Sequence, residues 1–438
     1  MNFTQSTIFS IFASFGLLLI NMFINVIESR VLGPTEIGRY QVFITTQTLF
    51  ATFCALGMGQ SCIYFINALK ENERKVLATT VNSTIPIATI SSMILFIILV
   101  FSPDYFGREN VWCIALFCIG TDAMLINNVF TPVLLTKMEV VKNQIIKYSS
   151  RIFTVTSLFV ILLWSNELSV GILLALAGFT NITSMFILYY YFSKRFSFRD
   201  GIDLPLLGRI LKWGIKLSGN NIASIILSSV PIYFLTWFSS EEGFLNVGFY
   251  SRANSLLVIG TVITSSVGPL LYSRWSLVKG EELKAQVQKV SMLFIILNFT
   301  IALGLILFAP LLIHTLYGKN YNAAIPVLQL LSLSLLGNGI KEVCYGVLSS
   351  QGAPIKILKN LSIGIIMSAG LCYITIPFMG VIGCTIATTL VTISTAILLM
   401  WDVTKISHIT MKDFFVAPSK SEIRNILNII TNSIVRRK

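Results

Sequence analysis

Charged residues are scarce in this sequence. Only 12% of its 438 residues are Asp, Glu, Lys or Arg, whereas 55% are hydrophobic. Soluble globular domains carry about a quarter charged residues. A deficit of this size over a chain of this length excludes an ordinary soluble protein and predicts a polytopic membrane protein.

The side chains that usually hold metals or cofactors are also few. The two histidines, His314 and His408, lie far apart, and no two cysteines have CxxC spacing. All seven cysteines fall inside apolar runs, which is typical of small buried hydrophobic residues. The P-loop pattern GxxxxGK[ST] is missing as well. The sequence therefore predicts no metal site, no nucleotide cofactor and no enzyme active site.

Long apolar runs are abundant instead. Each of twelve runs is long enough for a helix to cross about 30 Å of hydrocarbon. They cover approximately 4–28, 39–68, 76–101, 111–136, 144–164, 168–193, 213–238, 247–273, 288–314, 322–350, 356–378 and 380–401. The N-terminus has no basic region or cleavage site, so we expect the first run to be retained rather than cleaved as a signal peptide. The sequence thus predicts an all-α polytopic membrane protein with about 12 transmembrane helices.

The distribution of Lys and Arg predicts the orientation in the membrane. Basic residues concentrate in alternate connections, such as the longest one, 194–212. The positive-inside rule places these connections, and with them both termini, in the cytoplasm. Topology therefore explains the net charge of +13, and no nucleic-acid binding is expected. Arg30 and Arg39 are exceptions, because they occupy the first outward turn and oppose the pattern.

The C-terminal segment differs in kind from the apolar runs. Its apolar residues recur at helical spacing, and it ends in Arg436, Arg437 and Lys438. Such a pattern predicts an amphipathic helix at the cytoplasmic membrane surface. The alternative is a frayed polar tail. The apolar positions are Ile423, Ile426, Leu427, Ile430 and Ile434.

An internal repeat organises the chain. The segments GPTEIGRYQ and GFLNVGFYS share the pattern Gly-x4-Gly-x-Tyr and lie 210 positions apart. Parallel repeats of this kind place substrate sites between the two halves. We therefore expect two six-helix halves around a central cavity. The predicted units are an N-terminal lobe (1–193), a cytoplasmic linker (194–212), a C-terminal lobe (213–401) and a cytoplasmic tail (402–438).

Polar residues form stripes within four of the predicted spans. In the first span, Asn21, Asn25 and Glu28 share one helix face. The second, seventh and eighth spans carry similar stripes of Ser, Thr, Asn and Gln. Small polar residues are also common in ordinary helix packing. However, two asparagines and a glutamate on one face favour a solvated cavity, because such a face is costly against lipid.

Ionisable residues inside the spans indicate what this cavity binds. Cations outnumber anions, which suits an anionic ligand, and arginine in particular matches phosphate oxygens. Local pairs, Glu28 with Arg30 and Lys341 with Asp122, are an alternative. The candidate substrate-binding residues are Arg30, Arg39, Arg252, Arg151, Lys341, Asn21 and Asn25, and the candidate ion-coupling residues are Glu28 and Asp122.

The chain resembles the polysaccharide-repeat flippases, the Wzx-type O-antigen transporters of the multidrug/oligosaccharidyl-lipid/polysaccharide superfamily. The segments that carry the resemblance are LGPTEIGRYQ after the first span, VGFYSRANSL at the eighth, and YGVLSSQGAPIKILKN between the tenth and eleventh. The resemblance implies two lobes around a cavity lined mainly by the first, second, seventh and eighth spans. Related peptidoglycan-precursor flippases use cavity arginines for a diphosphate, for which Arg30, Arg39 and Arg252 are the candidates here.

The resemblance also implies a function in lipopolysaccharide biosynthesis. The cargo would be an undecaprenyl-diphosphate-linked oligosaccharide, flipped from the cytoplasmic to the periplasmic leaflet of the bacterial inner membrane by alternating access. Its lipid tail would stay in the bilayer between the lobes. Other polysaccharide assembly proteins would be further partners.

Two rival functions fit the composition less well. A drug or cation exporter of the same superfamily predicts an acidic cavity. A membrane polysaccharide polymerase or ligase predicts a large outward loop with reactive groups, whereas the outward connections here are short. The sequence therefore favours the flippase.

Overall fold

The computed structural model describes residues 3–136, 140–165, 168–192, 200–238, 242–407 and 409–416. These residues form helices and contain no β-strand, which confirms the all-α fold. The predicted C-terminal amphipathic helix lies outside them. The longer helices are α1 (Phe3–Ala55), α3 (Glu73–Phe101), α5 (Val111–Thr136), α6 (Val140–Ser165), α7 (Val170–Phe192), α8 (Leu204–Phe238), α9 (Gly243–Trp275), α10 (Gly280–Leu316), α12 (Ser334–Ser350) and α13 (Pro354–Ile406). The shorter elements are α2 (Met58–Ile63), η1 (Tyr64–Ala68), α4 (Pro103–Phe106), η3 (Lys319–Tyr321), α11 (Ala324–Ser332) and η4 (Met411–Phe415).

The number of membrane-crossing segments agrees with the sequence. Nine helical segments of the described chain are long and apolar enough to cross a membrane. Two of these contain a helix of 53 residues, α1 and α13, and each reverses direction at a glycine with positive φ: Gly33 (77°) and Gly380 (54°). A residue with a Cβ rarely adopts such backbone angles. Counting α1 and α13 twice and adding the 33-residue α9 gives the predicted twelve segments.

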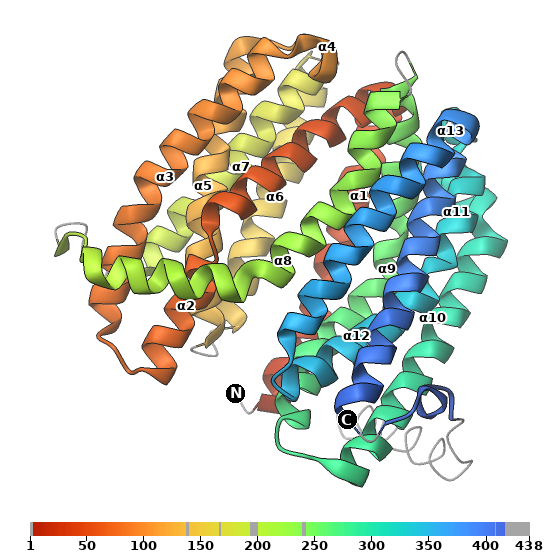
Figure 1. Ribbon diagram of the computed structural model, residues 1–438. Coiled ribbons are helices and arrows are strands. Elements are labelled where there is room, and N and C mark those ends of the chain that lie inside the picture. The colour runs from red at the N-terminus through yellow and green to blue at the C-terminus, as the bar shows by residue number, and fades with distance from the viewer. Residues whose placement is uncertain are drawn as a thin grey trace, which may run out of the picture.

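The helices form two lobes (Figure 1). Helices α3, α5, α6 and α7 make up one group and α9 to α13 the other, while α1 and α8 contact both. We call α1 to α7 the N-lobe and α8 to α13 the C-lobe. Both described ends of the chain lie at the same, lower end of the molecule in Figure 1. We call the opposite end, which carries α4 and the kinks of α1 and α13, the upper end.

The two copies of the Gly-x4-Gly-x-Tyr pattern pack against each other. A Cβ atom on Gly38 would overlap the carbonyl oxygen of Phe244, and a Cβ atom on Gly248 would overlap that of Pro34. Pro34 and Phe244 are themselves 210 positions apart, which is the offset of the repeat. The contact between α1 and α9 is therefore reciprocal. Glycine is needed at both positions because no side chain fits between the two backbones.

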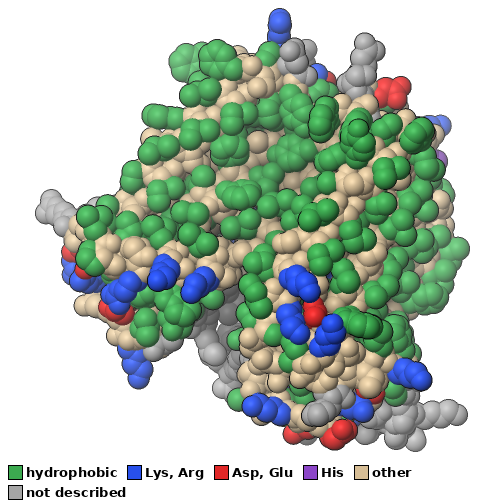
Figure 2. Space-filling view, viewed as in Figure 1, with side chains coloured by type: hydrophobic (Ala, Val, Ile, Leu, Met, Phe, Trp, Pro, Cys, Tyr) green, Lys and Arg blue, Asp and Glu red, His purple; other side chains and the backbone are tan. Residues whose placement is uncertain are grey.

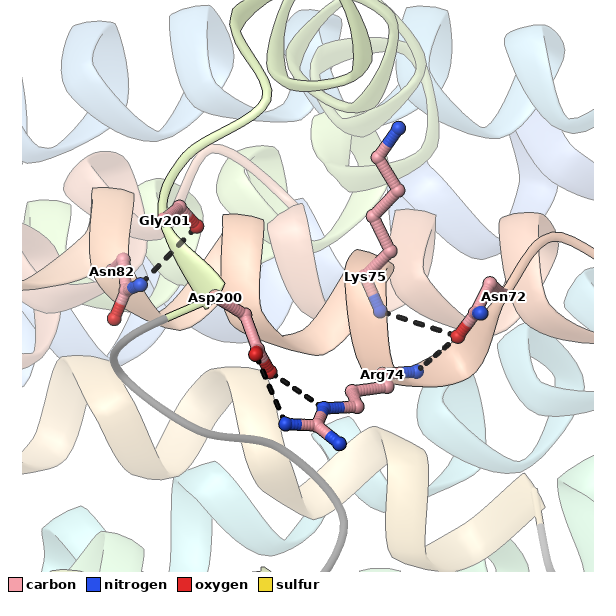
Figure 3. Close-up of polar contacts among 6 residues, drawn as sticks. All are labelled: Asn72, Arg74, Lys75, Asn82, Asp200 and Gly201. Carbon is pink, nitrogen blue, oxygen red and sulfur yellow. Dashed lines mark hydrogen bonds and ion pairs between the residues drawn. The ribbon is translucent and has the colours of Figure 1, made fainter.

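Helix α8 begins at Leu204, within the segment 194–212 that the sequence assigned to a linker. Its first turns pack on the N-lobe, where Ser61 Oγ donates a hydrogen bond to the Ile210 carbonyl at 2.9 Å. The residues just before it are held to α3 by ion pairs. Arg74 binds both carboxylate oxygens of Asp200, at 2.7 and 3.0 Å (Figure 3). Helix α8 therefore joins the two lobes along its own length.

The surface is that of a membrane protein. Hydrophobic side chains cover most of the visible face of both lobes, and Lys and Arg gather toward the lower end (Figure 2). Large apolar side chains such as Trp164, Phe378 and Leu163 are 84 to 91% exposed, which would be unfavourable in water. The chain is therefore a multi-pass membrane protein.

Candidate functional site

A large cavity lies in the N-lobe. It has a volume of about 610 Å³ and is lined by α1, α5, α6 and α7, with a single residue from α9. A volume between 300 and 1,000 Å³ is typical of small-molecule sites. Its ionisable lining residues are Glu28, Lys147, Arg151 and Arg252, together with Tyr40.

The two lobes meet in this cavity through a buried ion pair. Arg252 Nη2 of α9 lies 3.1 Å from Glu28 Oε2 of α1, and the two side chains are only 5% and 7% exposed. The Arg252 Nε–H is buried without a hydrogen-bond acceptor among the described residues. Removing either partner of a buried ion pair leaves an uncompensated charge and strongly destabilises the fold. Glu28 therefore pairs with Arg252 of the other lobe, and not with Arg30 as the local alternative would have it.

Two further cations enter the cavity from α6. Lys147 and Arg151 are four residues apart, so they lie on the same face of the helix. Neither makes an ion pair with a described carboxylate, since the only acidic lining residue already binds Arg252. The cavity consequently has an excess of positive charge.

Neutral polar side chains complete the lining. Asn21 and Asn25 contribute amides from α1, as the sequence predicts, and Asn181 and Ser184 add an amide and a hydroxyl from α7. These groups offer both donors and acceptors. The sequence analysis did not single out the α7 residues, although their spacing of three also lies within one helix face.

The remaining candidate arginines lie outside this cavity. Arg30 Nε donates to the Leu316 carbonyl at 3.0 Å, and its Nη2 donates to the Thr315 carbonyl. These are terminal carbonyls of α10, which lack partners within the helix and attract cations. Arg30 therefore caps α10.

Arg39 belongs to a cluster at the upper end. Its Nη1 lies 3.2 Å from Glu36 Oε2 and 3.4 Å from Glu109 Oε1, and its guanidinium lies over the ring of Phe244 at 5.5 Å. These contacts use the charge of Arg39 to hold the loop before α5 against both lobes.

Asp122 and Lys341, which the sequence considered as a pair, lie in different lobes. Asp122 faces Ser92 of α3 and does not line the cavity. Lys341 of α12 lines a second cavity of about 180 Å³ in the C-lobe. No described carboxylate lies within ion-pair distance of Lys341.

The second cavity is the repeat counterpart of the first. Five lining positions of the N-lobe cavity recur 210 residues later in the C-lobe cavity. The pairs are Leu17 and Leu227, Asn21 and Pro231, Tyr40 and Tyr250, Ile44 and Asn254, and Asn181 and Val391.

This arrangement corrects the expected lining. The seventh and eighth spans, α8 and α9, contribute mainly to the C-lobe cavity, whereas α6 and α7 supply about half of the N-lobe cavity. The polar stripes therefore serve two cavities, one per lobe. The reason is that each half of the repeat builds its cavity mainly from its own helices, with Arg252 of α9 as an exception in the N-lobe cavity.

Known proteins resemble this chain in sequence and in fold. The sequence pattern of the family described as polysaccharide biosynthesis protein matches residues 3–271. A protein of Shigella flexneri assigned as an O-antigen transporter is 23% identical over 403 residues, which cover 87% of this chain and 93% of that protein.

Two solved structures share the fold. The lipid II flippase MurJ in its inward closed conformation has a TM-score of 0.76 at 15% identity, with 93% of this chain and 89% of that chain covered. An inward-facing multidrug resistance MATE transporter of the MOP superfamily has a TM-score of 0.71 at 16% identity, with 89% and 94% covered. The family pattern matches well over half of the length of this chain, so the chain belongs to the polysaccharide biosynthesis protein family.

Proposed function

We propose that this protein is a flippase. It moves an undecaprenyl-diphosphate-linked oligosaccharide from the cytoplasmic to the periplasmic leaflet of the bacterial inner membrane. The main support is the charge of the N-lobe cavity, where three cations face one carboxylate that is already paired. This balance favours an anionic ligand and disfavours the cations that a drug exporter would carry.

Arg151 and Lys147 bind the diphosphate in this proposal. The planar guanidinium of Arg151 can donate two parallel hydrogen bonds to phosphate oxygens, and the ammonium of Lys147 adds a second charge one turn away. Neither cation gives up an ion pair with a described carboxylate when the ligand binds. Arg252 lines the same cavity but already binds Glu28.

The sugars occupy the neutral part of the lining. Asn21, Asn25, Asn181 and Ser184 surround the same space and can bind hydroxyl groups as donors or acceptors. The rest of the oligosaccharide extends beyond the cavity, because a volume of about 610 Å³ is small for a whole repeat unit.

Transport requires that the lobes separate at the upper end. The reciprocal contact of Gly38 and Gly248 closes that end. The basic lower end faces the cytoplasm by the positive-inside rule, so the described state is closed toward the periplasm. Opening would part α1 from α9 and disturb the Glu28–Arg252 pair. Protonation of Glu28 would favour this step, which makes Glu28 a better-placed coupling group than Asp122.

Complementation in a flippase-deleted strain tests the proposal. Wild type, Arg151→Ala, Arg151→Lys and Lys147→Ala are compared at matched membrane expression, and surface polysaccharide is scored. Arg30→Ala is the matched control, because it also removes an arginine but lies outside the cavity. We expect Arg151→Ala to abolish the polymer, Arg151→Lys to retain part of it, and Arg30→Ala to behave as wild type.

The outcomes separate the rival functions. Full activity of Arg151→Ala and Lys147→Ala would contradict the anionic site. Failure of the wild type in every strain with a known repeat unit would favour an exporter of the same superfamily.

A further inference from the structure

The seam between α1 and α6 opens toward the membrane. A groove of about 320 Å³ runs between the two helices on the outside of the N-lobe. Its walls are Leu19, Ile20 and Phe23 of α1, and Ile152, Val155 and Thr156 of α6. The cavity described above lies on the other side of the same two helices, which line it with Asn21 and Arg151 among others.

The groove offers no free hydrogen-bond donor to a ligand. Five of its six lining residues are apolar, and the sixth, Thr156, donates its hydroxyl to carbonyls of its own helix, at 3.0 Å from both Ile152 O and Phe153 O. Leu19, Phe23 and Ile152 are 47 to 53% exposed. A polar occupant would lose its hydration here without compensation, so the groove suits a hydrocarbon.

Two packing points bound the groove and keep it open between them. At one end the Tyr148 hydroxyl donates to the Ala13 carbonyl at 2.8 Å, and Gly16 leaves room for that hydroxyl. At the other end the rings of Phe23 and Phe159 are 6.2 Å apart. The groove therefore lies between two fixed contacts of α1 with α6, and we call this stretch of the helix contact the window.

Charge and apolar surface meet at this window. Arg151 faces the cavity and the next residue, Ile152, faces the groove. An amphiphile with an anionic head on Arg151 would therefore find an apolar surface directly beside that head. The lobe interface at the upper end, by contrast, is closed by the contact of Gly38 and Gly248.

We infer that the groove between α1 and α6 holds the first part of the polyprenyl chain while the diphosphate occupies the N-lobe cavity. This inference rests on the proposed function. It differs from the expectation that the lipid tail lies between the lobes, because it places the tail within the N-lobe alone. The lipid would enter sideways through the window, and the two lobes would not need to separate for binding.

Photolabelling tests the inference on the full-length protein in lipid nanodiscs. The probe is a long-chain polyprenyl diphosphate with a diazirine near its head, and labelled peptides are mapped by mass spectrometry. Val155→Trp and Leu19→Trp fill the groove from its two walls. Val160→Trp is the matched control, because it makes the same change on the same helix at a position that is 60% exposed.

We expect labels on α1 near Leu19 and on α6 near Val155 in wild type and Val160→Trp. In Val155→Trp and Leu19→Trp these labels should fall about tenfold, the effect of losing about two buried methylene groups. Inorganic diphosphate should compete with the probe, since it occupies the head site.

Three results would overturn the inference. Unchanged labelling of both α1 and α6 in the two groove-filling variants would exclude the groove. In the second result, the probe labels residues between the lobes while inorganic diphosphate still reduces the labelling. This result would place the tail elsewhere and leave the proposed function intact. Equal labelling by a photoreactive polyprenol without the diphosphate would remove the head site, and the proposed function would fail with the inference.

Discussion

Gly38 and Gly248 occupy equivalent positions of the two repeats. Gly38 packs on the backbone of Phe244, and Gly248 packs on the backbone of Pro34, the residue equivalent to Phe244 in the first repeat. The atoms that a Cβ on Gly38 would meet belong to the Phe244 carbonyl and the Gly248 amide nitrogen, which cannot rotate away as a side chain could. The contact that closes the upper end is therefore formed by equivalent residues of the two repeats.

Substitution of either glycine should open this contact. We expect Gly38→Ala and Gly248→Ala to lower the free energy of unfolding by about 1–3 kcal/mol, the usual cost of overpacking. Thermal unfolding of the purified variants measures the effect. Gly304→Ala is the control, because a Cβ there meets no atom within 4 Å. Equal melting of all three variants would contradict the role of the contact.

The Glu28–Arg252 pair should behave as a unit. Arg252→Met leaves a buried carboxylate without its partner, so we expect a loss of about 3–5 kcal/mol in unfolding free energy. The double variant Arg252→Met/Glu28→Leu should recover most of that stability, because no unpaired charge remains, but it should not restore transport. A double variant no more stable than Arg252→Met would show that the two charges do not depend on each other.

Arg30 should matter for stability and not for transport. Its guanidinium caps α10, and a cation at a helix C-terminus contributes about 0.3–1 kcal/mol. Arg30→Ala should therefore lower the melting temperature slightly and leave surface polysaccharide unchanged. Loss of transport without loss of stability would instead indicate that Arg30 binds substrate.

The anchor of α8 should weaken in acid. Lys75 Nζ lies 2.5 Å from Asp203 Oδ2, and the hydrogen bond from Lys75 holds the pKa of the Asp203 carboxyl below its usual range. A carboxyl whose pKa is lowered in the folded state stabilises the protein above its unfolded pKa, and that contribution is lost as the pH falls through the folded pKa.

Comparison of wild type with Asp203→Asn checks this anchor. We expect the variant to melt at a lower temperature than wild type at neutral pH, and the difference to shrink as the pH falls below about 4, the ordinary pKa of Asp. A difference that is constant with pH would assign the effect to the side-chain shape and not to the charge.

The sequence was sufficient where the physics is local. The length of the apolar runs predicts the twelve segments, and the helical period predicts that Asn21, Asn25 and Glu28 share a cavity-facing side. The offset of 210 residues predicts two equivalent halves. These features depend only on residue spacing along the chain.

Partners distant in sequence could not be predicted in this way. Arg30 binds carbonyls 285 and 286 residues later, and Glu28 binds an arginine 224 residues later. The sequence also could not predict which lobe holds the larger cavity. The polar stripes on α1 and α8 are similar, and the difference between the cavities depends on how α6 and α7 pack. The early start of α8 was missed because Leu204 to Lys212 is too rich in basic residues to resemble a span.

The residues that join the lobes are separate from most of those that line the N-lobe cavity. The close contact uses α1 and α9, whereas Lys147, Arg151, Asn181 and Ser184 lie on α6 and α7. Mutations on α6 and α7 can therefore alter which cargo is accepted without touching the closing contact. Under the proposed function, a few substitutions on α6 and α7 would be enough to change which sugars are bound, while the contact between α1 and α9 stays unchanged.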